Sequence, residues 1–368
     1  MKMKTPNRET LFTPGPVMMD PDSLDLGGRQ MIYHRTAEFS DTILNCQRML
    51  KSAAGASGGD RVVILTASGT AAMEAAVLNL LPPSATAYWI NGGEFGKRFG
   101  EICRCHGAAE VEISLEPGRQ IRPSDLPVPD GPGGVLLVNH HETSTGTVYD
   151  LDLLSRYCRQ HGLLLVVDAI GSFLADPLAM TRQGIDALLF SSQKALGLPP
   201  GLSFAILNHR ALARARAGRP RSYYFNFRRY LEDGERGQTP FTPAIGIIRQ
   251  LERRLQAILE RGTDRVTASV GMLAEDFRGR LDGLPFRLFS ESPSNALTAL
   301  QPTGGLAPDY YVRRLREHGC TVCPNGGDLG RKIFRVGHLG ALAVEDNARL
   351  AAALRVVVAE SARVAVCA

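Results

Sequence analysis

Lys194 has the clearest chemical potential in this 368-residue sequence, because it closes the segment Ser191 to Lys194 directly after an apolar stretch, Ala187 to Phe190. A lysine at the end of a buried strand is expected to lie away from bulk water, and desolvation lowers the pKa of an amine. A neutral amine is a nucleophile that forms Schiff bases with carbonyl compounds. An ion pair with a neighbouring carboxylate is the alternative that the residues leave open.

Asp168 follows a second apolar stretch, Leu163 to Val167, and lies 26 residues before Lys194. A buried carboxylate without a partner is costly, so Asp168 needs one. A cationic ring nitrogen of a ligand would serve, and so would a structural hydrogen bond from the protein itself.

Three further segments suit a phosphate, a planar ring and a carboxylate. Ser68-Gly69-Thr70 opens a predicted helix whose first amides and hydroxyls would cradle a phosphate, although Ser68 could equally be an ordinary N-cap. Phe95 could stack on a planar ring or belong to the core. Arg335 lies inside a short apolar strand, where it suits bidentate capture of a carboxylate or a salt bridge between domains. With the lysine and the aspartate, these groups are the set that pyridoxal phosphate chemistry requires.

Short apolar strands that alternate with helices must position these groups. The alternation predicts an α/β fold with a mostly parallel sheet covered by helices on both faces. Polar residues that follow the strands then meet at the carboxyl edge of the sheet, where ligands bind. The expected strands are 62–65, 86–90, 111–114, 135–139, 163–167, 187–190 and 203–207, and the expected helices are 70–81, 94–106 and 151–161.

The alternation of apolar strands and helices ends after about residue 210. The segment 210–243 is rich in arginine, aromatic residues and glycine and breaks the alternation, and a strongly amphipathic helix is expected at 245–260. A smaller α+β domain follows, so we expect a domain boundary near residue 262. Its expected helices are 266–281, 308–318 and 344–359, and its expected strands are 286–289, 296–300 and 333–336.

Length and composition exclude an intrinsically disordered chain, a collagen-like fibre and a disulfide-rich mini-protein. Apolar residues make up 44% and charged residues 21%, as in ordinary globular proteins, and the net charge is a mild +5. The most basic stretch, 210–221, is expected to be a solvated surface segment rather than a nucleic-acid groove. No apolar run is long enough to span a membrane, and the polar first ten residues lack the apolar segment of a signal peptide, so we expect a cytoplasmic protein.

Seven cysteines without an export signal are expected to be reduced thiols. Cys103 with Cys105 and Cys320 with Cys323 could supply four thiolates to zinc, or a redox pair. The two pairs lie more than 200 residues apart in the sequence. We therefore favour ordinary packing and expect no metal site.

The sequence resembles the class V aminotransferases, within fold type I of the pyridoxal-phosphate enzymes. It is most similar to the alanine–glyoxylate, serine–pyruvate and 2-aminoethylphosphonate–pyruvate transaminases. The resemblance runs nearly end to end and implies a large domain with a mostly parallel seven-stranded sheet. It is carried by the segments 13–17, 34–39, 67–70 with Glu74 and Ala75, 91–98, 141–146, 167–169, 191–201 and 335–340.

The resemblance also implies a cofactor, roles for individual residues, and an assembly. The cofactor would be pyridoxal 5′-phosphate, and the assembly a homodimer with its sites at the two-fold interface. The implied segments are a substrate-lining N-terminus (1–20), a large cofactor-binding domain (21–262) and a small C-terminal domain (263–368). Lys194 would be the Schiff-base lysine and proton carrier, and Asp168 the partner of the pyridine nitrogen. Phe95 would stack on the ring, Ser68, Gly69 and Thr70 would form the phosphate cup, Gln193 would be the polar neighbour of the lysine, and Thr143 would place a hydroxyl near the phenolic oxygen. Thr242 would contact the phosphate bound by the neighbouring subunit, Gly15 would form part of the substrate pocket, and Arg335 would bind the substrate α-carboxylate.

The substrate stays open at this point. Phe95 stands where relatives often carry Trp or Tyr, and the aromatic segment 219–242 does not identify a donor. Arg29, expected near the pocket entrance, leaves a phosphonate substrate open. We expect an amino group to move from a small amino acid or aminophosphonate to a keto acid such as pyruvate or glyoxylate.

Other readings remain as alternatives. A lyase or other pyridoxal-phosphate chemistry would use the same lysine. A cysteine desulfurase needs a cysteine close to the substrate arginine, and Cys320 and Cys323 precede Arg335 at positions that we expect to be unsuitable. A non-catalytic scaffold subunit is disfavoured because the lysine, the aspartate and Arg335 are all present. A nicotinamide dehydrogenase is disfavoured because no Gly-x-Gly-x-x-Gly follows the first strand.

Overall fold

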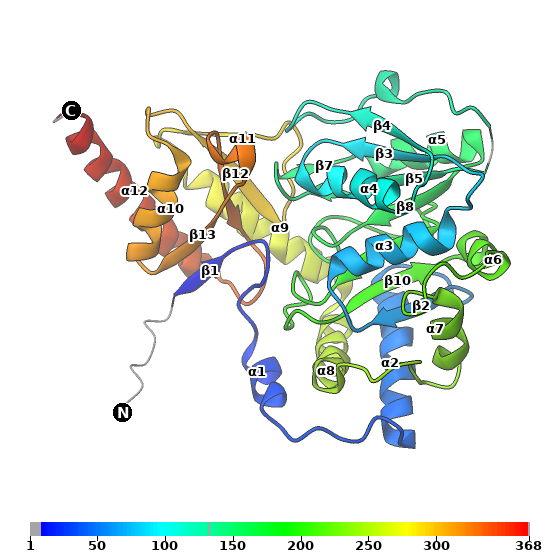
Figure 1. The fold of residues 1–368 in the computed structure, drawn as a ribbon. Coiled ribbons are helices and arrows are strands. Elements are labelled where there is room, and N and C mark those ends of the chain that lie inside the picture. Colours follow the sequence, from blue (N-terminus) through cyan, green and yellow to red (C-terminus); the bar gives the residue numbers. More distant parts are fainter. Residues whose placement is uncertain (1–8, 132, 367–368) are drawn as a thin grey trace.

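The computed structural model describes residues 9–131 and 133–366, which form two sheets of different size joined by helices (Figure 1). The larger sheet has the strand order β2-β10-β9-β8-β5-β3-β4, and every neighbouring pair is parallel except those that involve β10. The predicted fold class is therefore confirmed. The strands are β2 (Arg61–Leu65), β3 (Ala87–Asn91), β4 (Glu110–Ser114), β5 (Val135–Asn139), β8 (Leu164–Asp168), β9 (Ala187–Ser191) and β10 (Ser203–Leu207).

The apolar strands of this sheet are buried on both faces, and alternate side chains enter two separate cores. Val167 packs in one core with helices on one side, whereas Val166 packs in the other core with helices on the opposite side. This period of two explains why the strands read as continuous apolar runs. The first core contains α2 (Ala37–Ala53), α5 (Leu151–His161) and α8 (Ile245–Arg261), and the second contains α3 (Gly69–Leu80), α4 (Glu94–Cys105), α6 (His209–Ala217) and α7 (Phe227–Gly234).

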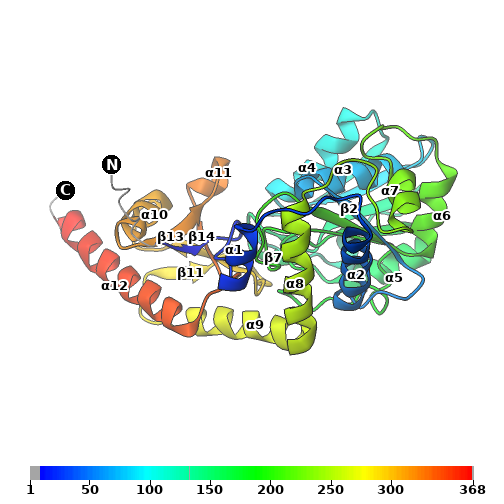
Figure 2. The ribbon, with the colours of Figure 1, turned by 90° about the horizontal axis from the view of Figure 1, so that it is seen from below.

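The smaller sheet has the order β1-β13-β14-β12-β11 and lies beside the larger one in Figure 1. Its first strand comes from the beginning of the chain and pairs in parallel with β13. Figure 2 shows α9 reaching from α8 towards the small sheet, which it contacts at β12. The elements are β1 (Thr10–Phe12), β11 (Phe286–Leu288), β12 (Leu297–Pro302), β13 (Cys320–Pro324), β14 (Phe334–Gly337), α9 (Thr263–Gly279), α10 (Pro308–Glu317), α11 (Gly327–Gly330) and α12 (Val344–Val366).

Several elements have no counterpart in our predictions. The segment 210–243 contains α6 and α7, and its arginines are not simply solvated: Arg214 and Arg221 donate hydrogen bonds to backbone carbonyls near the end of α3. The remaining unpredicted elements are β1, α1 (Pro21–Gly27), α2, η1 (Pro123–Asp125), the ribbon β6 (His141–Glu142) with β7 (Thr147–Val148), β13 and α11. None of the helices in the described part of the chain is long and apolar enough to cross a membrane.

Candidate active site

A cavity of about 120 Å³ lies at the carboxyl edge of the large sheet, among the residues that follow its strands. It brings together eight of the residues singled out from the sequence, so strand ends far apart in the chain do meet at one place. These eight are Ser68, Gly69, Thr70, Phe95, Thr143, Asp168, Gln193 and Lys194. Five residues that were not singled out complete the lining: Arg98, Asn139, His141, Ile170 and Gly171.

Asp168 is the last residue of β8 and is 4% exposed. Its carboxylate accepts hydrogen bonds from the Asn139 side-chain amide at 2.5 Å and from the Ile170 backbone amide at 2.7 Å. Both donors are neutral, and burial raises the pKa of Asp168 to about 7. The described residues give this carboxylate no salt bridge, so a cation that entered the cavity would find an unneutralised partner.

Lys194 follows β9 and lies largely within the protein. The pKa of Lys194 is lowered to about 8, mainly by burial and also by the nearby Arg335 guanidinium, while the Asp168 carboxylate opposes the fall. The N-terminal loop closes over the side chain: a Cβ added to Gly15 would lie 2.6 Å from the lysine Cδ. Gly15 also has φ = +137°, a backbone conformation that L side chains rarely adopt, so this approach requires glycine.

The start of α3 forms the end of the cavity that suits a phosphate. Ser68 occupies the N-cap position, but its side chain makes no capping hydrogen bond, so its hydroxyl is not used by the helix. Thr70 accepts a hydrogen bond from the Arg98 guanidinium at 3.1 Å. Helix-start amides, two hydroxyls and a guanidinium together favour a bound anion.

Phe95 lies in the first turn of α4 and is half-buried rather than part of the core. A fully buried carboxylate, Glu142, positions that turn by accepting hydrogen bonds from the backbone amides of Gly96 at 2.7 Å and Phe95 at 3.4 Å. The Arg98 guanidinium lies 4.8 Å from the centre of the Phe95 ring. The ring is therefore held at the cavity wall, where it can stack on a planar ligand.

Arg335 lies in β14, is 9% exposed and points towards the large sheet. Its guanidinium donates to the Thr143 carbonyl at 3.1 Å and to the Pro324 carbonyl at 2.5 Å, and its Nε has no hydrogen-bond partner among the described residues. The Cys323 Sγ lies 3.0 Å from the same guanidinium. Our expectation that Cys323 is unsuitably placed is wrong in this respect, because antiparallel pairing of β13 with β14 sets Cys323 directly opposite Arg335.

Some predicted residues lie outside the cavity lining. Thr242 is exposed, and nothing in a single chain brings it to the phosphate end of the cavity. Arg29 forms an exposed ion pair with Asp25, so it does not reach the cavity either. Gly15 and Arg335 border the site through Lys194 and Thr143 rather than line the cavity itself.

The residues that sequence reasoning missed are informative in two different ways. Glu142 stood among the polar residues after a strand, and its neighbours gave no sign that it would hold the start of α4. His141 stood in the same segment, yet it is buried in the cavity wall with neither ring nitrogen hydrogen-bonded to any residue that the structure describes. The position of a residue after a strand could have suggested both, but only the packed structure separates a structural carboxylate from an unpartnered imidazole.

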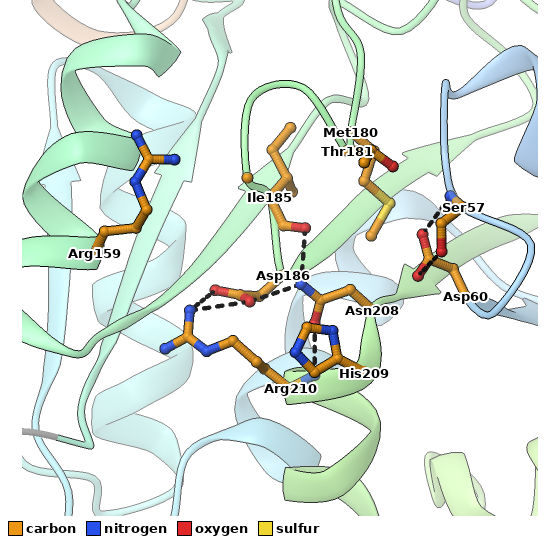
Figure 3. Close-up of a pocket in the computed structure, with 11 residues that line it drawn as sticks. Ser57, Asp60, Arg159, Met180, Thr181, Ile185, Asp186, Asn208, His209 and Arg210 are labelled. Carbon is orange, nitrogen blue, oxygen red and sulfur yellow. Dashed lines mark hydrogen bonds and ion pairs between the residues drawn. The ribbon is translucent and has the colours of Figure 1, made fainter.

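A larger cavity, of about 460 Å³, lies at the opposite edge of the sheet, where β9 begins and β10 ends (Figure 3). Its central carboxylate, Asp186, is 1% exposed and forms a 3.0 Å ion pair with Arg210. Asp186 also accepts hydrogen bonds from the Asn208 side chain and the Leu165 backbone amide, each at 2.8 Å. Both carboxylate oxygens of Asp186 therefore already have partners within the protein.

The thiols of Cys103 and Cys320 are buried in different parts of the fold, and all six cysteines in the described residues are free thiols. Within residues 9–131 and 133–366, no group of three or more His, Cys, Asp or Glu side chains is placed to hold a metal ion.

A lysine and a buried aspartate at the carboxyl edge of such a sheet, with a phosphate cradle beside them, define the architecture of a fold type I pyridoxal-phosphate enzyme. The cavity residues fit that cofactor, because Asp168 lacks a cation and the Ser68 hydroxyl is not used as a helix cap. Comparison with known proteins agrees. The family model "Aminotransferase class-V" matches residues 24–324, and the chain belongs to this family. It is therefore a pyridoxal-phosphate-dependent aminotransferase.

The relatives cover nearly the whole chain. A protein of Synechococcus sp. called the small subunit of a soluble hydrogenase is 31% identical, over 96% of this chain and 94% of that protein. Alanine–glyoxylate aminotransferase of Oryctolagus cuniculus is 30% identical, over 95% and 92%. Among solved structures, an aspartate aminotransferase of Thermus thermophilus is 31% identical with a TM-score of 0.89, over 96% of this chain and 99% of that one.

Proposed function

We propose that this enzyme transfers an amino group from a small amino acid or aminophosphonate to a keto acid such as pyruvate or glyoxylate. The observation that carries the proposal is that Lys194 and Asp168 share one cavity, with the amine at lowered pKa and the carboxylate without a cation. Alanine–glyoxylate and aspartate aminotransferase are the activities in the names of relatives 30% and 31% identical to this chain.

Asp168 is the residue that would hold the cofactor ring nitrogen. Its pKa is about 7, and a cation beside it favours the ionised carboxylate. The pair would keep a proton on the ring nitrogen. Ser68, Gly69 and Thr70 would bind the phosphate, Phe95 would stack on the ring, Gln193 would lie beside the lysine and Thr143 would lie near the phenolic oxygen.

When bound, pyridoxal phosphate supplies an aldehyde that condenses with amines and a ring that withdraws electrons from the substrate α-carbon. Lys194 would hold that aldehyde until the donor amine displaces it. The freed amine, with a pKa of about 8, would then take the proton from the substrate α-carbon and deliver it to the former aldehyde carbon of the cofactor. Arg335, with its unpartnered Nε, would bind the substrate carboxylate, and the Gly15 loop would limit the space beside the lysine.

We propose that the enzyme is a cytoplasmic homodimer in which Thr242 reaches the phosphate of the neighbouring subunit. Support comes from the exposure of Thr242 and of two aromatic side chains, Tyr33 at 66% and Tyr223 at 73%. The free thiols agree with a reducing compartment. Analytical ultracentrifugation tests the assembly, and a monomer that retains full activity would contradict it.

A trapping experiment tests the proposed function. The purified enzyme is loaded with pyridoxal phosphate, reduced with borohydride and digested, and mass spectrometry should locate the adduct on Lys194. A panel of amino donors, including alanine, serine, aspartate and aminoethylphosphonate, is then assayed with pyruvate and with glyoxylate. An adduct at another lysine, or an unreduced cofactor-loaded enzyme that transfers no amino group from any donor to either acceptor, would contradict the proposal.

A further inference from the structure

His141 is the polar residue of the cofactor cavity that no role described above uses. It lies in β6, is 2% exposed, and lines the cavity with both ring nitrogens free of hydrogen bonds to the described residues. Buried polar atoms in native proteins are nearly always paired, so two unpaired nitrogens in a cavity wall indicate a partner that enters with a ligand.

The imidazole faces the cavity beside Thr143 and Gly171. A Cβ added to Gly171 would lie 2.6 Å from the His141 Nδ1 and 3.0 Å from the Thr143 Oγ1, so both side chains approach the same backbone from the cavity wall. His141 lies beside Thr143, which follows β6 in the turn before β7, and both side chains line the cavity. The absence of a side chain at Gly171 keeps the space in front of them open.

The charged groups around the ring favour its neutral form. The pKa of His141 is lowered to about 3, mainly by burial, with smaller contributions from His140, Lys194 and Arg335. The nearby Gly171 backbone opposes the fall, although neither ring nitrogen forms a hydrogen bond with a described residue. Asp168 and Arg98 are the other charged residues in the cavity lining. A neutral imidazole carries one N–H donor and one acceptor nitrogen. It can therefore donate a hydrogen bond to a single ligand oxygen, but it offers no positive charge to pair with a carboxylate.

The covalent structure of pyridoxal phosphate identifies that oxygen. Three of its polar groups are assigned above: the ring nitrogen to Asp168, the aldehyde to Lys194 and the phosphate to the start of α3. The phenolic oxygen, for which Thr143 alone is proposed above, lies next to the aldehyde and on the side of the ring away from the phosphate arm. In the sheet, β5 leads to His141 and lies on the far side of β8 from β2, which leads to the phosphate cradle.

We propose that His141 is a positioning residue that donates a hydrogen bond to the phenolic oxygen of the bound cofactor, beside Thr143. This inference rests on the proposed function. A donor to that oxygen stabilises its anionic form and weakens its hold on the proton shared with the imine nitrogen of Lys194. His141 therefore orients the cofactor ring and lowers the pH at which the bound chromophore loses its proton.

The test measures the pH midpoint of the visible absorbance change in the cofactor-loaded enzyme, and the cofactor dissociation constant, in three variants. His141→Leu removes the donor and should raise the midpoint by about one pH unit and weaken cofactor binding about tenfold. His141→Gln keeps an N–H donor and should stay near the wild-type midpoint. His140→Gln is the matched control, because His140 is equally buried but does not line the cavity, and it should leave the midpoint unchanged.

The outcomes separate this inference from the proposed function. A wild-type enzyme without a cofactor absorbance band contradicts the proposed function itself. A normal band whose midpoint is unchanged or lowered in His141→Leu overturns the role of His141 alone. If that variant does not fold, ring-nitrogen NMR of the wild-type enzyme decides: the His141 resonances, assigned by their loss in His141→Gln, should move on cofactor loading more than those of His140, and equal or absent movement overturns the inference.

Discussion

Asp168 and Asp186 are two buried aspartates at opposite edges of the same sheet: Asp168 is the last residue of β8, and Asp186 directly precedes β9. Asp186 has a guanidinium, a side-chain amide and a backbone amide as partners. Among the described residues, Asp168 has two neutral hydrogen-bond donors and no salt bridge. The fold therefore pairs Asp186 with a cation, whereas Asp168 can still accept a cation from a ligand.

The same contrast extends to the surroundings of the two aspartates. Around Asp168 the buried atoms without hydrogen-bond partners include Asn139 Oδ1, Gln193 Oε1 and both His141 nitrogens. In the larger cavity, by contrast, Asp186 is bonded to two other lining residues, Asn208 and Arg210 (Figure 3). Cavity size is therefore a poor guide to function in this molecule, and unfinished hydrogen bonding is a better one.

The largest effect expected at the carboxyl edge follows from loss of the amine. Lys194→Ala should lower turnover by roughly a thousandfold or more, since it removes both the covalent anchor and the general base. Steady-state kinetics with the best donor measure this effect. Lys97→Ala is the matched control, because its side chain is 53% exposed in an ion pair on α4. A Lys194→Ala enzyme with turnover within tenfold of the control would show that the carboxyl edge is not the site of the reaction, and the contrast between the two edges would lose its basis.

The paired strands and helices of the large sheet could be predicted from the sequence because their apolar runs are continuous and their helices begin at recognisable residues. Asp150, the N-cap of α5, and Gly162, which ends that helix in a left-handed conformation, are local signals of this kind. By contrast, α2 is partly polar and gains its place by packing on α8, some 200 residues later in the sequence. β1 and β13 are short, and their places in the small sheet depend on pairing with each other and, for β13, with β14.

The site divides in the same way. Lys194 and Asp168 could be predicted because each follows a buried strand, so topology alone brings them together. Cys323 could not be placed, because its position beside Arg335 depends on the register of two short strands. His141 and Asp186 could not be distinguished from ordinary polar residues, since the number of hydrogen-bond partners is a property of the packed structure.

The second effect concerns the missing cation at Asp168, studied in the cofactor-free protein. The native pKa of about 7 exceeds the ordinary value of 3.8, so as pH rises the unfolded chain ionises first and native stability falls. Asp168→Asn removes this dependence. Its free energy of unfolding relative to wild type should improve by roughly 4 kcal/mol between about pH 4 and pH 7 and change little above that range.

Chemical denaturation at several pH values measures the Asp168→Asn effect. Cofactor affinity should change in the opposite direction to stability. The amide of the variant cannot neutralise a protonated ring nitrogen, so the cofactor should bind more weakly. A stability difference that is flat with pH would show that Asp168 already has a charged partner, and the contrast with Asp186 would then disappear.

The third effect lies at the amino edge. Asp186→Asn leaves Arg210 without a counter-charge and should lower the free energy of unfolding by about 2 kcal/mol, with unchanged turnover per folded molecule. Thermal denaturation of wild type and variant measures the loss. Asp152→Asn is the matched control, since its 3.8 Å pair with Arg182 is exposed and contributes little. A loss of activity without a loss of stability would mean that the amino edge also has a functional role.

The smallest expected effect distinguishes Arg335 from Arg210 when each is changed to lysine. Arg335 has a free Nε at the carboxyl edge, whereas Arg210 donates to Asp186 and to the Leu163 carbonyl. Lysine keeps the charge but loses the planar fork, so Arg335→Lys should raise KM for the keto acid about tenfold with a smaller change in kcat. Arg210→Lys should lower the melting temperature and leave KM unchanged. If both variants changed only stability, Arg335 would be a second structural arginine, and the carboxylate of the substrate would bind elsewhere.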